Sequence, residues 1–277
     1  MIVREIPPET SPDAALAMKR AALRVLTWNV QHASAARGLR QAAWLAAQPD
    51  ADVIALTEVA GGASGDSLAQ SLAAHGYRVH LPVSGGRDYR VLLATRVGEL
   101  QVMPLNVTHL PHRAAGAVIS HPAGWRLGLV GLYVPSRGPR ARRNLDKRAF
   151  QDATSALLSR LPTVFSDDLP VVVAGDLNVV EPGHQPHHSV FGKWEYDFYR
   201  SFATAGYTDL YRMHHPERAE HSWFGRSGAG YRFDHLFCTT DQPLTASGCR
   251  YIHHARSDGL SDHSALSADL IWVAPTT

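Results

Sequence analysis

Short apolar stretches alternate with polar, helix-like stretches along most of the chain. Apolar runs bounded by turn-forming residues predict strands, whereas apolar residues spaced three and four apart predict helices. The ranges with a strand pattern are 23–30, 52–57, 77–81, 89–95, 115–121, 125–134, 169–174, 232–238 and 264–273. The ranges with a helix pattern are 37–48, 67–75, 140–161 and 193–205.

The predicted strands outnumber the predicted helices, and some neighbours form hairpins. Residues 115–121 and 125–134 flank a Pro-Ala-Gly turn and predict such a hairpin. The pattern therefore differs from a purely parallel, doubly wound sheet. Two mixed sheets packed face to face, with helices outside, account for it. We expect one α/β (α+β) domain at 23–277 after an extension at 1–22, where Ser11 and Pro12 mark a helix start.

Composition narrows the protein class. Of 277 residues, 45% are apolar and 19% charged, which is typical of a folded globular protein. Lys and Arg number 27 against 25 Asp and Glu, so the net charge of +2 excludes a strongly basic nucleic-acid binder but not a local basic cleft. Two cysteines exclude a secreted disulfide framework. Without a signal-peptide pattern or a long apolar stretch, we expect a cytoplasmic protein with no membrane span.

Polar side chains recur where the predicted strands end. They are Asn29, Glu58, Tyr133, Asp176, Asn178 and Asp234, and the loop before the last strand adds Asp262 and His263. Side chains at the ends of neighbouring strands meet at one edge of a sheet, where open α/β folds place binding sites. We therefore expect these residues to form one site.

The residue types indicate the chemistry of that site. Four carboxylates with two amides and no thiolate suit a hard cation such as Mg²⁺ or Mn²⁺. A bound cation offsets phosphate charge and helps to generate hydroxide from water. Asp176 is the candidate to deprotonate the attacking water, and His263, oriented by Asp234, is the candidate to carry a proton or contact a phosphoryl oxygen. The alternative for each residue is a structural one, such as a turn or a cap.

Six motifs taken together resemble the endonuclease/exonuclease/phosphatase superfamily, with the exonuclease III/AP-endonuclease branch closest. The motifs are TWN (27–29), LTEV (56–59), GLYVPSRG (131–138), GDLN (175–178), YRFDH (231–235) and SDH (261–263). The resemblance covers about residues 23–273. It implies a four-layer α/β/β/α sandwich and Mg²⁺-dependent cleavage of phosphoester bonds.

The resemblance also implies a role for each residue. The metal ligand is Glu58, assisted by Asn29 and Asp262. The water-activating pair is Asp176 and Asn178, and the Asp–His pair is Asp234 and His263. The phosphate contacts are Tyr133 and Arg113. Apart from the resemblance, the aromatic pair Trp223 and Phe224 is a candidate wedge at a DNA lesion or else part of the core rim. Whether His263 acts as a base or as a cationic clamp stays open.

Departures from the family pattern leave the substrate open. The residue two positions after Asn29 is Gln31 rather than Asp or Asn, the stretch 225–230 is short, and the loop after GDLN carries His184, His187 and His188. These histidines shape a smaller pocket, bind a second metal or belong to a flexible loop. We expect a monomeric enzyme that cuts DNA. A basic helix with Arg140, Arg142, Arg143, Lys147 and Arg148 either contacts DNA phosphates or forms a solvated surface. The alternatives are a small or lipid-like phosphoester substrate and, less favoured because every catalytic position is filled, a non-catalytic binding module.

Overall fold

The computed structural model describes residues 22–84, 86, 88–137, 141–239 and 244–272, without the side chains of residues 141–143. The extension expected at 1–22, with its helix, lies outside the described residues except for Ala22, which begins the first strand. None of the described helices combines the length and the apolar character needed to cross a membrane.

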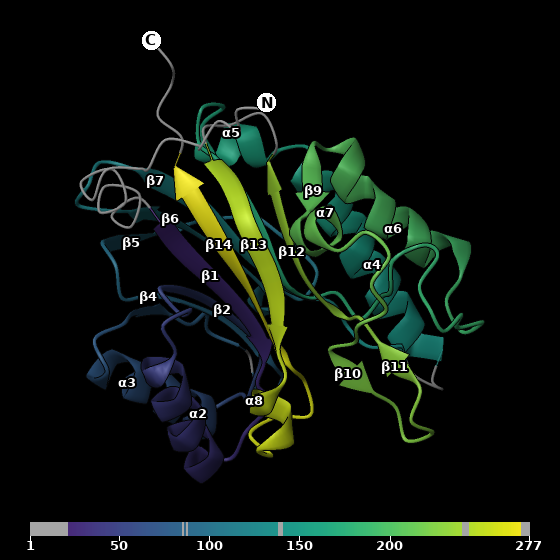
Figure 1. Cartoon of the computed structure of the whole chain (residues 1–277), viewed down its shortest axis with the longest axis horizontal. Coiled ribbons are helices and arrows are strands. Elements are labelled where there is room, and N and C mark those ends of the chain that lie inside the picture. The colour runs from purple at the N-terminus through teal and green to yellow at the C-terminus, as the bar shows by residue number, and fades with distance from the viewer. Residues whose placement is uncertain (1–21, 85, 87, 138–140, 240–243, 273–277) are drawn as a thin grey trace, which may run out of the picture.

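Six strands form the first sheet, called sheet A. They are β1 (Ala22–Asn29), β2 (Val53–Val59), β3 (Arg78–His80), β4 (Arg90–Thr95), β13 (Leu244–Ile252) and β14 (Ala265–Trp272). Their order across the sheet is β13-β14-β1-β2-β4-β3 (Figure 1). The pair β1 and β2 is parallel and the other pairs are antiparallel, so the sheet is mixed.

Six further strands form sheet B. They are β5 (Glu99–Met103), β6 (Ala114–Ser120), β7 (Arg126–Tyr133), β8 (Val171–Asp176), β9 (Tyr207–Asp209) and β12 (Asp234–Thr239). Their order is β5-β6-β7-β8-β12-β9, and β7 and β8 are the parallel pair. A separate two-stranded hairpin joins β10 (Trp223–Phe224) to β11 (Gly230–Tyr231).

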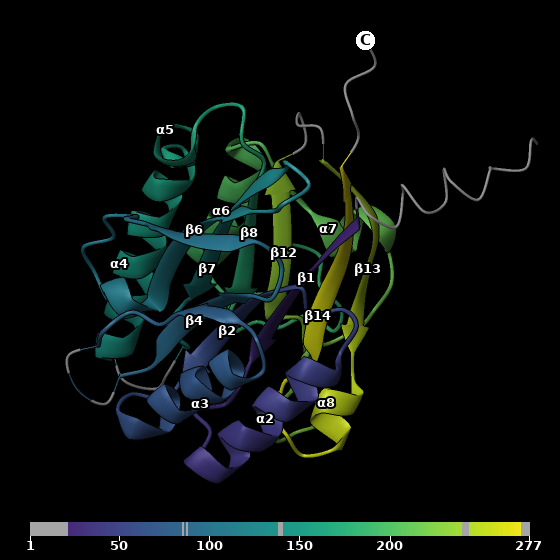
Figure 2. The ribbon, with the colours of Figure 1, turned by 90° about the vertical axis from the view of Figure 1, so that its left-hand side faces the viewer.

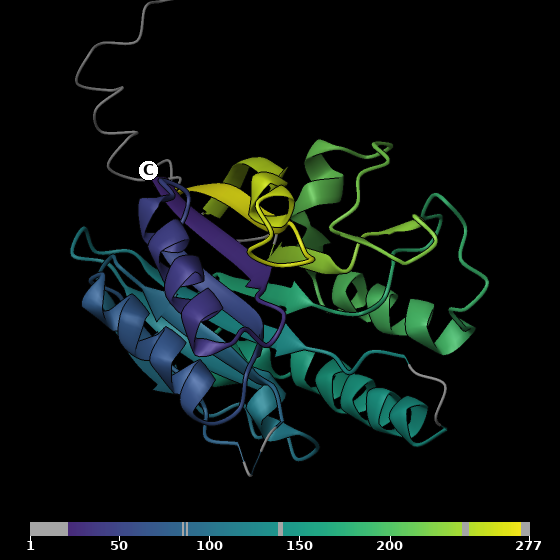
Figure 3. The ribbon, with the colours of Figure 1, turned by 90° about the horizontal axis from the view of Figure 1, so that it is seen from below.

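Helices cover the outer faces of both sheets (Figure 2). Sheet A carries α2 (Ala35–Ala47), α3 (Ala63–Ala74) and the short α8 (His254–Ser257). Sheet B carries α4 (Ala141–Leu158), α5 (Leu161–Phe165) and α6 (Lys193–Thr204). The remaining helices are the 3₁₀ turn η1 (Pro111–Arg113) and α7 (Leu210–His214). Seen from below, the two sheets lie between the two helix layers (Figure 3).

The alternation of side chains along each strand builds three apolar layers. In β1, Val25 packs between the sheets, whereas Leu26 and Trp28 pack under the helices of sheet A. A strand turns successive side chains to opposite faces, so strands buried on both faces read as continuous apolar runs. The two mixed sheets and their outer helices confirm the predicted α/β/β/α sandwich.

The structure contains elements that the sequence did not predict, namely β5, β9, the hairpin of β10 and β11, and the short helices α7 and α8. Two further differences have a visible cause. The helix expected at 140–161 ends at Leu158, and α5 begins at Leu161 with Pro162 in its first turn. The edge strand β13 carries polar residues on its exposed face and a bulge near Gly248, which weakens its pattern, so the sequence did not predict it.

Candidate active site

A cavity of about 900 Å³ opens where the ends of both sheets meet. Eight of the ten predicted site residues line it: Glu58, Arg113, Tyr133, Asp176, Asn178, Trp223, Asp262 and His263. The other two contact these residues directly, since Asn29 bonds to Glu58 and Asp176 and Asp234 bonds to His263. The structure therefore brings all ten residues together.

A β-bulge in β2 aims Glu58 into the cavity. The pairing with β4 shifts between Leu56 and Val59, and Glu58 has a left-handed φ of 54°. Without the extra residue, Glu58 would share a face with Leu56 and lie under the helices. With it, Val59 packs beside Leu56 in that apolar layer and Glu58 faces the cavity.

Asn29 links the carboxylates of the two sheets. Its Nδ2 donates to Oε2 of Glu58 at 2.9 Å and to Oδ2 of Asp176 at 2.8 Å. Its Oδ1 accepts from the main-chain N–H of Gln31 at 2.8 Å, which fixes the orientation of the amide. Asn29 is thus a donor between two acidic groups, and its role as an oxygen ligand for a metal stays a prediction.

The GDLN turn holds Asp176 in one position. The N–H of Asn178 donates to Oδ1 of Asp176 at 2.8 Å, and its Nδ2 donates to Oδ2 at 3.2 Å and to the carbonyl of Val134 at 2.9 Å. Gly175 has a φ of +145°, and a Cβ there would lie 2.0 Å from the carbonyl oxygen of Leu132. Only glycine allows β8 to approach β7 so closely. The turn therefore presents a carboxylate with both oxygens hydrogen-bonded.

Asp234 and His263 form a buried pair beside Asp176. Asp234 lies opposite Asp176 in the antiparallel pairing of β12 with β8, and its Oδ2 lies 2.7 Å from Nδ1 of His263. The indole N–H of Trp28 donates to the carbonyl of His263 at 3.0 Å and fixes the loop. Because Nδ1 faces Asp234, Nε2 is the remaining ring nitrogen that can reach substrate.

Burial and charge shift the pKa values of these groups. Burial, followed by the charge of Asp234, raises the pKa of Asp176 to about 7. Burial alone would lower the pKa of His263, but the charge and hydrogen bond of Asp234 outweigh it and raise this pKa to about 9. Burial and the charges of Glu58 and Asp176 raise the pKa of Tyr133 well above its usual value. At neutral pH the site thus holds a cationic His263 and a protonated Tyr133.

The donor atoms fit a hard divalent cation. Carboxylate oxygens of Asp176 and Asp234 lie within 4.8 Å of each other and of a ring nitrogen of His263, and the two carboxylates are the oxygen ligands of this cluster. The Oδ1 atoms of Asp234 and Asp262 are buried without a hydrogen-bond partner among the described residues. Unpaired buried carboxylate oxygens are costly, and a cation would satisfy them. The cluster overlaps the predicted catalytic residues, while Glu58 lines the same cavity.

Arg113 and Tyr133 form one wall of the cavity. The guanidinium of Arg113 lies 4.7 Å from the centre of the Tyr133 ring. Nη2 of Arg113 contacts Oδ1 of Asp88 at 2.5 Å, and His112 contacts the other oxygen at 2.8 Å. The tyrosine hydroxyl is hydrogen-bonded to Glu58. Asp88 therefore offsets part of the charge that Arg113 brings to a phosphate.

Another part of the cavity lining is aromatic. Trp223, Tyr231 and Phe233, here called the aromatic wall, all line the cavity. Phe233 stacks on Trp223 with centroids 5.7 Å apart and on Tyr231 at 5.0 Å. The indole N–H of Trp223 also donates to Oδ2 of Asp262 at 2.9 Å. Trp223 was predicted, whereas Tyr231 and Phe233 were missed, although they flank Arg232 with the period-two spacing of a strand.

A model of the endonuclease/exonuclease/phosphatase family matches residues 26–263, most of the chain. The chain belongs to this family. It is therefore a phosphoester hydrolase, as the motifs predicted. The search of curated proteins returned no match.

Solved structures of 21–23% identity share the fold. A 3′-5′ exonuclease (NExo) from Neisseria meningitidis superposes with a TM-score of 0.74 and 23% identity, over 90% of this chain and 100% of that one. A Neisseria 3′ phosphatase NExo bound to product DNA hairpin gives 0.73 and 21%, over 90% and 100%. An AP endonuclease from Archaeoglobus fulgidus gives 0.73 and 21%, over 89% and 98%.

A buried ion pair between Lys147 and Glu195, which the sequence did not predict, supports the GDLN turn on the side away from the cavity. Nζ of Lys147 donates to the carbonyl of Asn178 at 2.8 Å and to Oε1 of Glu195 at 2.6 Å, and both side chains are fully buried. Arg137, which lines the cavity, contacts Oε2 of Glu195 at 2.6 Å. Lys147 therefore cannot face DNA as expected.

Of the other basic residues expected on this helix, the structure describes the side chain of Arg148 alone. Arg148 is exposed, Arg140 lies outside the described residues, and the side chains of Arg142 and Arg143 are not described.

Two histidines near the site, His32 and His184, are held by hydrogen bonds. His32 contacts Oε1 of Glu58 through Nδ1 at 2.6 Å and stacks on Tyr89. Both ring nitrogens of His184 are bonded to the main chain, at Pro186 and Arg232, so this residue is no ligand for a second metal in this arrangement.

Proposed function

We propose that this hydrolase is a Mg²⁺-dependent phosphodiesterase that cuts DNA by the attack of a water molecule positioned at Asp176. The observation that supports this proposal best is the cavity, which is lined both by members of the buried acidic cluster and by the aromatic wall. A cavity of about 900 Å³ is much larger than one phosphate group needs, and aromatic rings stack on nucleobases or sugars. Of the structures of similar fold, one is described as a 3′-5′ exonuclease and another as bound to a product DNA hairpin, which supports the same substrate class.

Each residue has a role in this proposal. A divalent cation held by Glu58 would offset the phosphate charge and acidify a water molecule. Asp176, fixed by Asn29 and Asn178, accepts the proton that the water loses. His263, kept cationic by Asp234, donates from Nε2 to a phosphoryl oxygen that gains charge.

The cations of the cavity support an anionic substrate longer than one phosphate. Arg113, Arg137 and Arg226 all line it. Asp88 and Glu195 partly neutralise the first two, whereas Arg226 is exposed on the loop between β10 and β11. Flanking phosphates of a nucleic acid would meet these guanidinium groups.

A small or lipid-like phosphoester is the second candidate. Only five residues separate β10 from β11, and Lys147 is buried rather than available to a duplex. Fewer exposed cations mean fewer contacts to DNA phosphates. This candidate keeps the same catalytic residues and differs in the group that the aromatic wall receives.

The test compares the wild type with Asp176→Asn on an abasic-site duplex and on a panel of small phosphomonoesters and phosphodiesters. Each reaction is run with Mg²⁺, with Mn²⁺ and with a chelator. We expect chelator-sensitive nicking or trimming of the duplex, and a loss of at least about a hundredfold in Asp176→Asn. Asp152→Asn, an exposed change on α4, is the matched control and should keep full activity.

The outcomes separate the candidates. Binding to duplex should weaken with salt at a log–log slope of roughly −0.9 per phosphate contact. Turnover of a small ester with no cleavage of DNA would reject the DNA substrate and keep the catalytic residues. Undiminished cleavage by a folded Asp176→Asn variant would overturn the assignment of the site.

A further inference from the structure

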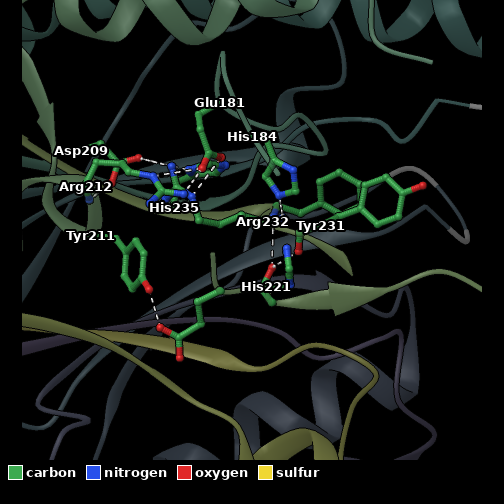
Figure 4. Close-up of polar contacts among 12 residues, drawn as sticks. Glu181, His184, Asp209, Tyr211, Arg212, His221, Tyr231, Arg232 and His235 are labelled. Atoms are coloured by element: carbon green, nitrogen blue, oxygen red, sulfur yellow. Dashed lines mark hydrogen bonds and ion pairs between the residues drawn. The ribbon is translucent and has the colours of Figure 1, made fainter. Parts of the chain in front are cut away.

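The loop that follows the GDLN turn packs against the hairpin that carries the aromatic wall. This segment, residues 181–188, is called the histidine loop. Figure 4 shows Glu181 and His184 of the loop beside Arg232, Tyr231 and His221 of the hairpin region. The contacts are specific hydrogen bonds and ring stacks rather than loose packing, so the loop and the hairpin form one unit.

His184 bonds to both segments and is held in one neutral form. Its Nδ1–H donates to the carbonyl of Pro186 at 3.1 Å, and its Nε2 accepts from the main-chain N–H of Arg232 at 3.2 Å. A nitrogen that accepts from an N–H carries no proton itself. The side chain is 5% exposed, and burial lowers its pKa to about 4. His184 therefore stays neutral and bonded throughout the physiological pH range.

His188 of the loop bonds to the hairpin, and His221, which precedes the hairpin, bonds back to the loop. Nε2 of His188 donates to the carbonyl of Gly230 at 2.9 Å, and its ring lies flat on Tyr231, with centroids 3.8 Å apart and 12° between the planes. Nε2 of His221 donates to the carbonyl of Gln185 at 2.8 Å. A Cβ at Gly230 would lie 2.4 Å from the His221 ring, so only glycine allows this approach.

A buried ionic network fixes the start of the loop. Nε of Arg232 donates to Glu181 at 3.0 Å, and its Nη2 donates to Asp209 at 2.7 Å. Arg212 pairs with the other oxygen of Glu181. Arg232 follows Tyr231 in the chain, and successive residues of an extended segment point to opposite sides. The network therefore holds Arg232 on one side while Tyr231 faces the cavity on the other.

We propose that the histidine loop selects the substrate: through His184 and His188 it sets the position of Tyr231, and so determines how well the aromatic wall accepts a nucleoside beside the scissile phosphate. This inference rests on the proposed phosphodiesterase function and deepens it. Neither histidine lines the cavity, so both are positioning residues that act through Tyr231. The loop contacts neither Asp176 nor His263 among the described interactions, and the hydrolytic step itself does not depend on it.

Two esters with the same leaving group test the proposal. Thymidine 5′-(4-nitrophenyl phosphate) presents a nucleoside to the wall, whereas methyl 4-nitrophenyl phosphate presents only a methyl group. His184→Phe keeps the ring but removes the acceptor for Arg232, and His188→Leu removes the ring stacked on Tyr231. For both variants we expect the KM of the thymidine ester to rise about fivefold, the worth of one aromatic contact. We expect kcat, and kcat/KM for the methyl ester, to stay within about twofold of wild type.

Further variants exclude a general loss of folding. His184→Gln retains an acceptor for the Arg232 N–H and should restore the selectivity of the wild type. Gly230→Ala disturbs the His221 contact from the hairpin side and should reproduce the change in KM. His75→Phe, at an exposed helix end under sheet A, is the matched control and should change nothing.

The results have distinct meanings. A wild type that hydrolyses neither ester nor the abasic duplex overturns the proposed function, and this inference with it. A wild type that hydrolyses the esters, with variants that lower the rates of both equally, leaves the function intact and overturns the selective role of the loop.

Discussion

The buried pair of Lys147 and Glu195 gives the sharpest test of how the GDLN turn is held. Lys147→Met removes an ammonium group that donates to the carbonyl of Asn178 and to Glu195 at 2.8 and 2.6 Å. Removing one partner of a buried ion pair costs about 3 to 5 kcal/mol. Because Arg137 still contacts Glu195 at 2.6 Å, the carboxylate stays neutralised, and we expect about 3 kcal/mol.

The effect on catalysis follows from the geometry of the turn. Asn178 has a left-handed φ of 48°, and its carbonyl loses its donor in the variant. Its N–H and Nδ2 then hold Asp176 less firmly, and a displacement of about 1 Å costs roughly a hundredfold in rate. We expect kcat to fall between tenfold and a hundredfold by this order-of-magnitude argument, with little change in KM.

The assays are thermal unfolding and steady-state hydrolysis of the best ester from the panel. A loss of about 3 kcal/mol corresponds to a fall in Tm of roughly 6 to 12 °C. Adding Glu195→Gln removes the partner charge as well. In a double-mutant cycle, the loss of stability in the double variant should then be much smaller than the sum of the losses in the two single variants. Arg148→Met changes the exposed neighbour on the same helix and should leave Tm and kcat unchanged. If Lys147→Met behaves like Arg148→Met, the pair does not hold the turn.

Three further outcomes are expected. Trp223→Phe keeps a ring in the aromatic wall but leaves Oδ2 of Asp262 without its donor, so unfolding measurements should show a loss of about 1 to 2 kcal/mol, and an unchanged stability would exclude this bond. The pKa of His184 is about 4 in the folded protein, where Glu181, His188 and His221 face it, against 6.5 in the unfolded chain. Its contribution to the free energy of unfolding, up to about 3 kcal/mol, is therefore complete above pH 6.5 and is lost as pH falls toward 4. Urea unfolding across this range should show a smaller dependence in His184→Gln, and equal slopes would contradict the assignment. Chelation should abolish hydrolysis and Mg²⁺ should restore it, whereas activity that survives exhaustive chelation would refute the metal requirement.

Most strands of the two sheets were predictable because their apolar periodicity is strong, whereas β5, β9, β13 and the short strands of the hairpin were not predicted. Strand β8 and the ends of β1 and β2 fall close to where the apolar runs predicted them. The sequence could also place Asp176 and Asp234 at strand ends, because a polar residue directly follows or begins each apolar run. What sequence cannot show is a change of face within a strand. Glu58 reaches the cavity through a bulge that appears only in the pairing of β2 with β4.

The prediction that Lys147 lies on a basic, DNA-facing side of the helix was wrong because it relied on the charge of the residue and not on its position in the helix. Lys147 shares a helix stripe with Phe150, Gln151 and Thr154, spaced three and four residues apart, and all of them are buried. That spacing was available in the sequence. The partner was not, because Glu195 lies 48 residues away on another helix. A buried lysine becomes plausible only when its carboxylate partner is known.

Gln31 and His32 explain how this chain fixes its acidic centre without the Asp or Asn that the family often has two positions after Asn29. The main-chain N–H of Gln31, rather than its side chain, bonds to Asn29 and turns the amide toward Glu58 and Asp176. His32 then contacts the outer oxygen of Glu58, while Asn29 contacts the inner one. An uncharged Gln31 leaves one negative charge fewer than an aspartate would, so repulsion among the remaining carboxylates is smaller. The position of Glu58 is therefore set by hydrogen bonds within the protein, and a cation would find this carboxylate already oriented.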